Sequence, residues 1–409
     1  MQLDREPWPR TSRRWESCGR LCHRFAAALL VTLAVCVQLG AQEEAQFGVA
    51  VPLTITGGIL DTGRAKADEA TAASLTAGFH LLAYPELELG SHWYAYSAIQ
   101  ARSTPFFYDD AYSADRKIDT NLLQGFVGYA RSWRKASIGL KAGKLASAFG
   151  SFPLRYDDMA NPLLDQPLAY TYVKLPYAGS SENEYGNALV TLYGLPGAEA
   201  DASWHRVDAR FQLTNSSPAN PQPLFASGEH AQWTAGAGYT IRQGFRVGMS
   251  AYRGPWLGSS LGYSWGPGAS FADFPATGLG IDARWARGHW SANGEWDRFQ
   301  FDVPNYTTQP VASFAYAEVK RIISPRWYAA FRANSQWNGH TAWPGWRSPG
   351  PFLPNQQAYE LAVGFRLNRL QLLKVGYEAM AVHGGPVVHN NVFGVQLVTS
   401  INSLSKAFR

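Results

Sequence analysis

Strict alternation of large apolar residues with small or polar ones is the feature that most restricts how this chain can fold. It is clearest in residues 233–252, where Trp233 and Tyr239 occupy odd positions and Thr240 and Arg242 even ones. A period of two places alternate side chains on opposite faces of a strand. The pattern breaks once, at a Gln-Gly pair, and then resumes. It therefore predicts two antiparallel strands joined by a tight turn, with one apolar and one polar face.

The same alternation recurs along the chain and predicts sixteen strands. They lie near residues 47–56, 72–83, 87–101, 120–132, 135–146, 186–194, 200–214, 230–241, 244–253, 277–286, 289–301, 311–322, 326–337, 357–367, 370–382 and 391–402. Most of these segments are close to the roughly 9–11 residues that a tilted strand needs to cross a membrane.

The connections between the predicted strands alternate between short and long. Short ones are predicted at 84–86, 134, 195–197, 243, 287–288, 324–325 and 368, and long ones at 57–71, 102–119, 147–185, 215–229, 254–276, 302–310, 338–356 and 383–390. A soluble sandwich has no reason to keep this rhythm, whereas an outer-membrane barrel has short periplasmic turns and long external loops. We therefore expect an all-β fold, a transmembrane antiparallel up-and-down β-barrel of about 16 strands, located in the outer membrane.

Tryptophan positions agree with a barrel that contacts outer-membrane lipid. Trp133, Trp285, Trp290 and Trp327 flank predicted short turns, and Trp93, Trp233, Trp296 and Trp337 lie toward predicted long connections. Indole rings favour the membrane interface, so this distribution predicts two aromatic girdles. The apolar strand face would then be the outside of the molecule. The sheet would have to close on itself, because unpaired backbone groups are too costly in hydrocarbon.

The first 41 residues are predicted to be a secretory signal peptide. The apolar run 25–37 follows a basic segment and is too short to cross a bilayer as a helix. We expect cleavage after Ala41, which leaves residues 42–409 as the barrel. A lipoprotein signal ending at Cys36 is the alternative, although a bulky valine precedes that cysteine where a small residue is expected.

Composition argues against nucleic-acid binding and against a bound cofactor. Removing the predicted leader takes away six Arg and three acidic residues, so the net charge falls from +5 to +2. All three cysteines lie in the leader, which leaves no cysteine metal site and no CxxCH haem motif in the rest of the chain. The nine histidines are scattered and begin no recognisable nucleophile or zinc motif. We therefore expect no cofactor, no metal, no catalytic residues and no enzymatic activity.

Carried around the barrel, the alternation predicts an inner face rich in charge. The predicted pore-lining residues are Lys141, Arg206, Asp208, Arg210, Arg246, Asp282, Arg284, Glu295, Arg332, Glu360, Arg366, Lys374 and Glu378. Opposite charges often lie two positions apart on one strand, which favours a mostly self-neutralised wall around a water-filled lumen. An arginine track that prefers anions is the alternative, and the small basic excess supports it weakly.

The third long connection, residues 147–185, is the longest, and loops of this length are usually functional. Its prolines, aromatic residues and leucines suit a segment folded against the inner wall, so we expect this external loop to fold into the pore. The predicted constriction residues are Arg155, Asp157, Asp158, Asp165 and Lys174. Acidic residues of the loop would face a basic wall and create a transverse field. An external cap without selectivity is the alternative.

The stretch GLKAGKLASAFGSFPLR, residues 139–155, resembles a strand end found in outer-membrane porins, in particular the phosphate-selective O/P-like porins. The resemblance at the level of the barrel covers the chain after the leader. It implies a channel for passive diffusion of small hydrophilic solutes and ions, and assembly as a homotrimer. The acidic third loop departs from the lysine and arginine ladder of the phosphate-selective type. Arg409 follows Phe408 at the end of the chain, where porins usually end in an aromatic residue.

Two other functions stay open at the level of the sequence. A barrel of this size could sheathe a periplasmic multihaem cytochrome in an electron conduit, which would require a haem-protein partner. An outer-membrane barrel enzyme would require a Ser/His or Asp/His constellation. We expect a porin with a weak preference for anions.

Overall fold

The computed structural model describes residues 45–61, 75–104, 117–152, 158–173, 187–188, 190, 194–215, 217, 231–257, 271–303, 309–338, 340–341, 350–351, 355–383 and 388–402. The predicted signal peptide lies outside these residues and remains a prediction.

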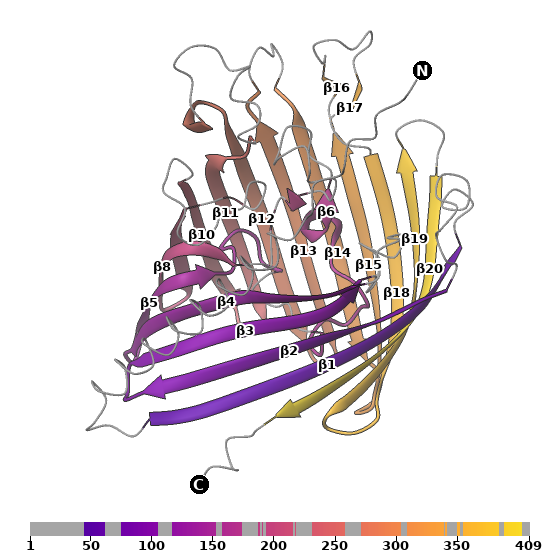
Figure 1. The fold of residues 1–409 in the computed structure, drawn as a ribbon, viewed down its shortest axis with the longest axis horizontal. Helices are drawn as coiled ribbons and strands as arrows, with labels where there is room; N and C mark the ends of the chain where they lie inside the picture. The colour runs from indigo at the N-terminus through magenta and orange to yellow at the C-terminus, as the bar shows by residue number, and fades with distance from the viewer. Residues whose placement is uncertain are drawn as a thin grey trace, which may run out of the picture.

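Sixteen strands form one closed antiparallel barrel in which consecutive strands lie side by side (Figure 1). They are β1 (Ala45–Asp61), β2 (Leu75–Leu89), β3 (Trp93–Thr104), β4 (Lys117–Ser132), β5 (Ala136–Leu145), β8 (Leu195–Trp204), β9 (Val207–Thr214), β10 (Gln232–Arg242), β11 (Phe245–Pro255), β12 (Pro275–Arg287), β13 (Trp290–Phe301), β14 (Val311–Ile322), β15 (Trp327–Asn338), β18 (Asn355–Arg366), β19 (Gln371–His383) and β20 (Val388–Asn402). The predicted all-β barrel is confirmed.

Short elements occur in the long connections. They are the pair β6 (Tyr172–Val173) and β7 (Asn187–Ala188), the pair β16 (His340–Thr341) and β17 (Gly350–Pro351), and the 3-10 turns η2 (Leu168–Tyr170) and η4 (Phe271–Asp273). Within the described part of the chain, no helix has the length and apolar character needed to span a membrane.

The first and last strands close the barrel. Ala50 of β1 lies opposite Asn402 of β20, and Ile59 lies opposite Phe393. The other side of β1 pairs with β2. Because each barrel strand has two hydrogen-bonded neighbours, the described barrel has no open sheet edge, which is the condition for a sheet in hydrocarbon.

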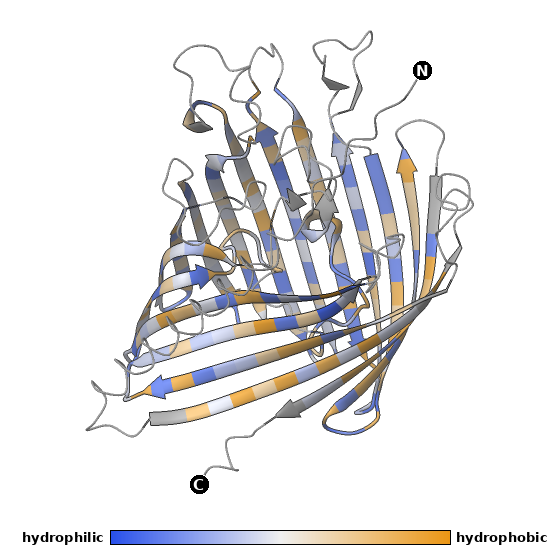
Figure 2. Cartoon of the chain, viewed as in Figure 1, coloured by the Kyte–Doolittle hydropathy of each residue, from blue (hydrophilic) through white to orange (hydrophobic). Residues whose placement is uncertain are grey.

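Apolar and polar residues alternate along the strands, as the bands in Figure 2 show. On β10 and β11 the side chains of Trp233, Tyr239 and Met249 are exposed, whereas Thr234 and Ser250 are buried. Exposed apolar residues elsewhere include Phe47, Ile55, Leu140, Phe211, Ile281, Phe331, Leu361, Tyr377 and Phe393. The apolar face is thus the outer face, and the prediction made from residues 233–252 is confirmed.

The turn between β2 and β3 lies elsewhere than predicted. Residues 84–86 belong to β2, where Pro85 pairs with Val49 of β1. The β2–β3 ladder skips Tyr84 and Pro85 and then continues. The turn itself begins at Gly90, which has a φ of 65°. Proline misled the prediction because it removes one backbone donor without ending an extended strand.

The strand predicted at 186–194 is also wrong. The sixth barrel strand is β8, and Pro196 and Gly197, predicted as a short turn, pair with β5. The turn that follows is formed by His205 and Arg206, and His205 has a φ of 55°. A Leu-Pro-Gly sequence is a common turn signal, but here the neighbouring strand keeps it extended. The connection between β5 and β8 therefore runs to residue 194.

Exposed tryptophans gather at the short-turn end of the barrel. They are Trp93, Trp133, Trp204, Trp290 and Trp327. Trp93 is next to the β2–β3 turn, and not toward a long connection as predicted, because that turn lies at residues 90–92. Trp233 and Trp337 are exposed at the other end of their strands. Exposed tryptophans therefore lie at both ends of the barrel, where the two aromatic girdles were predicted.

Candidate functional site

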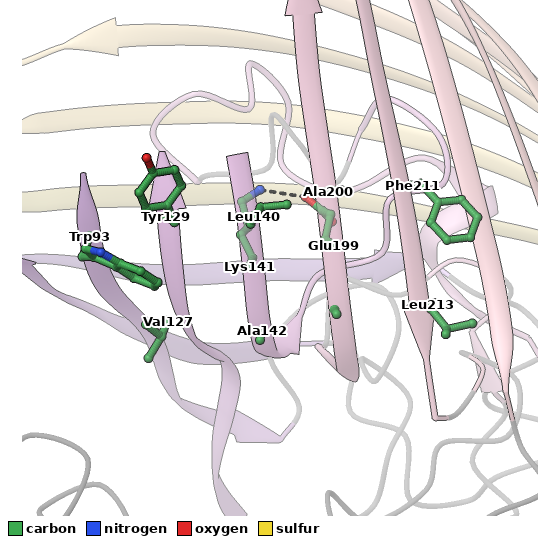
Figure 3. A pocket seen from close by; sticks show the side chains of 11 residues that line it. Trp93, Val127, Tyr129, Leu140, Lys141, Ala142, Glu199, Ala200, Phe211 and Leu213 are labelled. Atoms are coloured by element: carbon green, nitrogen blue, oxygen red, sulfur yellow. Dashed lines mark hydrogen bonds and ion pairs between the residues drawn. The ribbon is translucent and has the colours of Figure 1, made fainter. Parts of the chain in front are cut away.

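Opposite charges lie side by side on the polar face because the strand register aligns them. Lys141 Nζ on β5 is 2.7 Å from Glu199 Oε1 and 3.3 Å from Asp201 Oδ1 on β8. Lys141 and Glu199 are direct register partners. Figure 3 shows their ion pair. Cross-strand pairs of this kind neutralise the wall locally.

A second charge cluster joins β9, β11 and β12. Arg246 Nη2 is 2.6 Å from Asp208 Oδ1, and Arg246 Nη1 is 3.0 Å from Asp282 Oδ1. The neighbouring Gly248 leaves room for the guanidinium, since a Cβ at that position would lie 2.7 Å from Arg246 Nη1. One arginine thus bridges two carboxylates along the wall.

The connection between β5 and β8 packs against the polar face. We call its described residues 146–152 and 158–173 the third-loop segment. Phe149, Leu163 and Tyr170 of this segment are almost completely buried. Four groups of wall side chains bind it.

The first group centres on Lys374 of β19. Its ammonium donates to the carbonyl oxygens of Asp158 at 2.6 Å and Leu163 at 3.1 Å. A third hydrogen bond goes to Gln396 Oε1 at 2.7 Å. The Lys374 side chain is 0% exposed, so these three acceptors replace water around a buried charge.

The second group centres on Arg332 of β15. Its guanidinium lies 3.0 Å from Glu318 Oε2 and 3.4 Å from Glu360 Oε2. It also donates to the carbonyl oxygen of Asp165 at 2.9 Å and to Asn161 Oδ1 at 3.3 Å. Removing one member of a fully buried ion group leaves the others uncompensated, so this attachment depends on all of them.

The third group connects β11 and β13 to both ends of the third-loop segment. Glu295 accepts hydrogen bonds from the Ser151 backbone N–H at 3.1 Å, from the Ser151 hydroxyl at 2.9 Å and from the Tyr170 hydroxyl. The Gly150 N–H donates to Ser250 Oγ at 3.0 Å. Burial and the adjacent Glu295 raise the pKa of Tyr170 well above its usual value, so its hydroxyl remains a donor.

The fourth group holds Asp158 against the first two strands. Thr54 Oγ1 of β1 donates to Asp158 Oδ2 at 2.7 Å, and His80 Nδ1 of β2 lies 2.8 Å from the same oxygen. Burial alone would raise the pKa of the Asp158 carboxyl, but His80, Lys374 and the Thr54 hydroxyl outweigh burial and lower it. Asp158 is therefore a carboxylate in its attached position.

The strands that bind the third-loop segment are spread around the barrel. Side chains of β1, β2, β9, β11, β13, β15, β18, β19 and β20 take part. The segment is thus fixed to strands far apart in the closed barrel order.

All but one of the predicted pore-lining residues lie on strand positions opposite the exposed apolar face. They are Lys141, Asp208, Arg210, Arg246, Asp282, Arg284, Glu295, Arg332, Glu360, Arg366, Lys374 and Glu378. The exception is Arg206, which lies in the β8–β9 turn and donates to the carbonyl oxygen of Ile241. Among the predicted constriction residues, Asp158 and Asp165 belong to the third-loop segment. Arg155, Asp157 and Lys174 lie outside the described residues.

The sequence prediction missed Glu199 and Asp201 of β8. Glu199 was missed because it falls between the turn predicted at 195–197 and the strand predicted at 200–214. Asp201 was missed because that predicted strand runs through the actual turn at His205 and Arg206, so its alternation puts Asp201 on the face opposite Asp208. The alternation of Ala198 and Ala200 with these two acids is the signal that could have found β8.

An apolar groove lies on the outer face between β3 and β9. Figure 3 shows Trp93, Val127 and Tyr129 on one side of it and Phe211 and Leu213 on the other, with Leu140, Lys141, Ala142, Glu199 and Ala200 between them.

Within the part of the chain that the structure describes, no group of three or more His, Cys, Asp and Glu side chains is placed to hold a metal ion. Lys141 and Arg246 pair with wall carboxylates, and Arg332 and Lys374 bind the third-loop segment. The geometry therefore suits a polar, water-contacting wall.

No protein-family model matches the chain, and no curated protein matches it. Solved structures do match. OmpT, an outer-membrane protein of Vibrio cholerae, aligns with a TM-score of 0.51 and 9% identity, covering 88% of this chain and 99% of OmpT. The outer membrane channel DcaP of Acinetobacter baumannii aligns with a TM-score of 0.53 and 10% identity, covering 88% of this chain and 97% of DcaP. OprB of Pseudomonas putida aligns with a TM-score of 0.55 and 11% identity, covering 87% of this chain and 94% of OprB.

This chain has the fold of an outer-membrane channel barrel. The match covers 94% or more of each of these three neighbours. Sequence identities of 9–11% extend the likeness to the fold alone. A trimer form of the Vibrio cholerae OmpT has also been solved, with a TM-score of 0.50 to this chain and 8% identity.

Proposed function

We propose that this protein is an outer-membrane porin through which small hydrophilic solutes and ions diffuse passively. One observation carries the proposal: a closed sixteen-strand barrel exposes apolar side chains and carries paired charges on its opposite face. Barrels with this many strands enclose a lumen that wall side chains alone do not fill. An apolar exterior suits lipid, and a charged interior suits water.

The third-loop segment narrows this lumen. Its partners lie on strands spread around a closed barrel, and a single segment can reach all of them only through the interior. A segment fixed in this way would occupy the bore that a sheathed cytochrome needs. The porin is therefore favoured over the electron conduit.

The selectivity of the channel follows from a nearly balanced wall. Lys141 faces the carboxylates of Glu199 and Asp201, and Arg246 faces those of Asp208 and Asp282. Arg210 and Arg284 also lie near Asp208, so these two clusters hold four cations and four carboxylates. The predicted net charge after leader removal is small as well. We expect a weak preference for anions, measured as a small anion-directed reversal potential in a KCl gradient. A strongly cation-directed potential would contradict this expectation.

Assembly as a homotrimer is the expected quaternary state. The support is the solved trimer form of a barrel with the same fold. Native mass spectrometry in detergent should give three copies per particle, and a stable monomer under mild extraction would argue against it.

A vesicle-swelling assay tests the proposed function. Proteoliposomes should swell in isotonic solutions of small sugars and amino acids, at rates that fall as solute size increases. Vesicles that hold an equal amount of a narrow eight-stranded barrel are the control. Swelling no faster than in this control would overturn the proposal.

A further inference from the structure

The wall of the barrel divides into two sectors that differ in exposure. In the sector that holds the third-loop segment, Arg332, Glu360 and Lys374 are all 0% exposed. On β5, on β8 and at the short-turn end of β9, by contrast, the side chains of Lys141, Asp201 and Asp208 are 27%, 39% and 46% exposed. Farther along β9, Arg210 and Gln212 bind the third-loop segment. If the protein is a porin, solutes must therefore pass along the second sector.

Four aromatic rings lie beside that exposed sector, on β2, β3 and β4. We call Tyr84, Tyr94, Tyr96 and Phe126 the aromatic patch. The Tyr84 and Tyr96 rings stack with centroids 6.2 Å apart and planes at 15°. Phe126 lies 5.4 Å from the Tyr96 ring and 6.0 Å from the Tyr94 ring. All four side chains are half-buried, so part of each remains accessible.

The aromatic patch belongs to the inner face. Tyr94 and Tyr96 share their strand parity with Gln100, whose amide contacts His80, the partner of Asp158. Trp93, on the opposite face of β3, is 55% exposed. The Tyr94 ring occupies the space beside Gly128, where a Cβ would lie 2.7 Å from the tyrosine hydroxyl oxygen.

Hydrogen-bonding groups border the aromatic patch on β5 and β8. Lys141 Nζ lies 6.0 Å from the centroid of the Phe126 ring and is held by Glu199 and Asp201. One cation faces two carboxylates here, and Glu86 also acts on Tyr94, so the local charge is acidic and disfavours anions. Rings beside fixed donors and acceptors suit a neutral solute that has both an apolar face and many hydroxyls.

We propose that the aromatic patch and the Lys141 cluster form a carbohydrate-binding site on the open side of the lumen. The C–H face of a pyranose ring would lie against Tyr96 and Phe126, and its hydroxyls would bond to Lys141 and the two acids. This inference rests on the proposed porin function. It adds a substrate class that passive diffusion alone does not require.

Sugar block of ion current tests the site. Wild-type protein is inserted in a planar bilayer in KCl, and maltotriose is added to one side. We expect saturable, concentration-dependent interruptions of the current. A poly(ethylene glycol) of matched size, which has no ring faces, should reduce the current without saturation.

The double variant Tyr96→Leu/Phe126→Leu should raise the half-blocking maltotriose concentration by about tenfold and leave the unblocked conductance nearly unchanged. The matched control is Tyr239→Leu/Tyr377→Leu on the outer face, which should leave sugar block unaltered. If the double variant fails to insert, Tyr96→Leu alone replaces it, with a smaller increase expected.

A conducting wild type that shows no saturable sugar block would overturn the carbohydrate site and leave the porin standing. Equal block in wild type and patch variant would also overturn the site. A wild type that does not conduct would contradict the porin itself, which makes the two failures distinguishable.

Discussion

At the scale of single residues, buried charges hold the third-loop segment in place. Arg332 and Lys374 are both 0% exposed and donate to carbonyl oxygens of the segment. A buried cation without acceptors would be strongly destabilising. Each cation therefore favours the attached position of the segment, because any other position would take hydrogen-bond acceptors away from the buried charge.

Arg332→Met should detach part of the third-loop segment. The change leaves Glu318 and Glu360 buried without their cation, a loss on the order of 3–5 kcal/mol. We expect lower thermal stability and a larger, noisier single-channel conductance. Arg326→Met, in the exposed turn between β14 and β15, is the control and should behave like wild type. A quiet wild-type conductance in Arg332→Met would show that this attachment does not fix the segment.

The attachment of the third-loop segment through Asp158 should weaken at acidic pH. The pKa of the attached carboxyl is lower than its usual value of 3.8, so the attached state is stabilised above that pH and loses the stabilisation as pH falls below it. Current noise should be constant from pH 7 to pH 5 and rise below about pH 4. His80 and Lys374 face the carboxylate from β2 and β19.

Asp158→Asn isolates this group from the other carboxylates of the wall. The variant should be noisier than wild type at pH 7 and should change less than wild type on acidification. Identical pH profiles for the two proteins would exclude Asp158 as the titrating group.

The sequence predicts the face of these residues but not their partners. Parity along a strand is local, so Lys374 and Glu360 are correctly placed opposite the apolar face. Lys374 and the carbonyl of Asp158 are 216 positions apart, and strand periodicity contains no information about such a contact. The sequence therefore predicts that the third loop packs on the inner wall, but not which of the predicted pore-lining charges bind it.

At the scale of elements, the alternation of short turns and long connections identifies the barrel strands. Errors occur where turn residues lie inside strands. Pro85 in β2 and Pro196 in β8 both pair with a neighbouring strand. Local sequence favours a turn at these positions, and the ladder on either side overrides it.

Deleting residues 161–167 should enlarge the channel. This part of the third-loop segment supplies two of the acceptors of Arg332 and one acceptor of Lys374. Single-channel conductance should increase, and saturation by permeating ions should weaken. An equally long deletion at 342–348, in another long connection, is the control. Unchanged conductance in the first deletion would mean that the segment does not limit the current.

At the scale of the whole molecule, the inverted distribution of side chains defines the fold. The exposed face is apolar and the charges lie on the other face, so the barrel would be unstable with water on its outside. Period-two alternation makes this feature predictable from the sequence. The division of the wall into a covered and an open sector is not predictable, because it depends on the path of one loop in three dimensions.

Leu361→Lys tests which face contacts lipid. Leu361 lies near the middle of β18 and is 55% exposed. A lysine there should destabilise the membrane-inserted barrel by about 2–4 kcal/mol. Urea titration in lipid vesicles measures the change, with Thr240→Lys on the inner face as the control. Equal stabilities of the two variants would contradict the assignment of faces.

Planar-bilayer recording of the purified, refolded protein tests the central claim most directly. We predict stepwise, nearly ohmic increases of current as single barrels or trimers insert, with a small anion-directed reversal potential in a salt gradient. Protein that inserts, as judged by protease protection, but never gives a conductance step would contradict a water-filled channel.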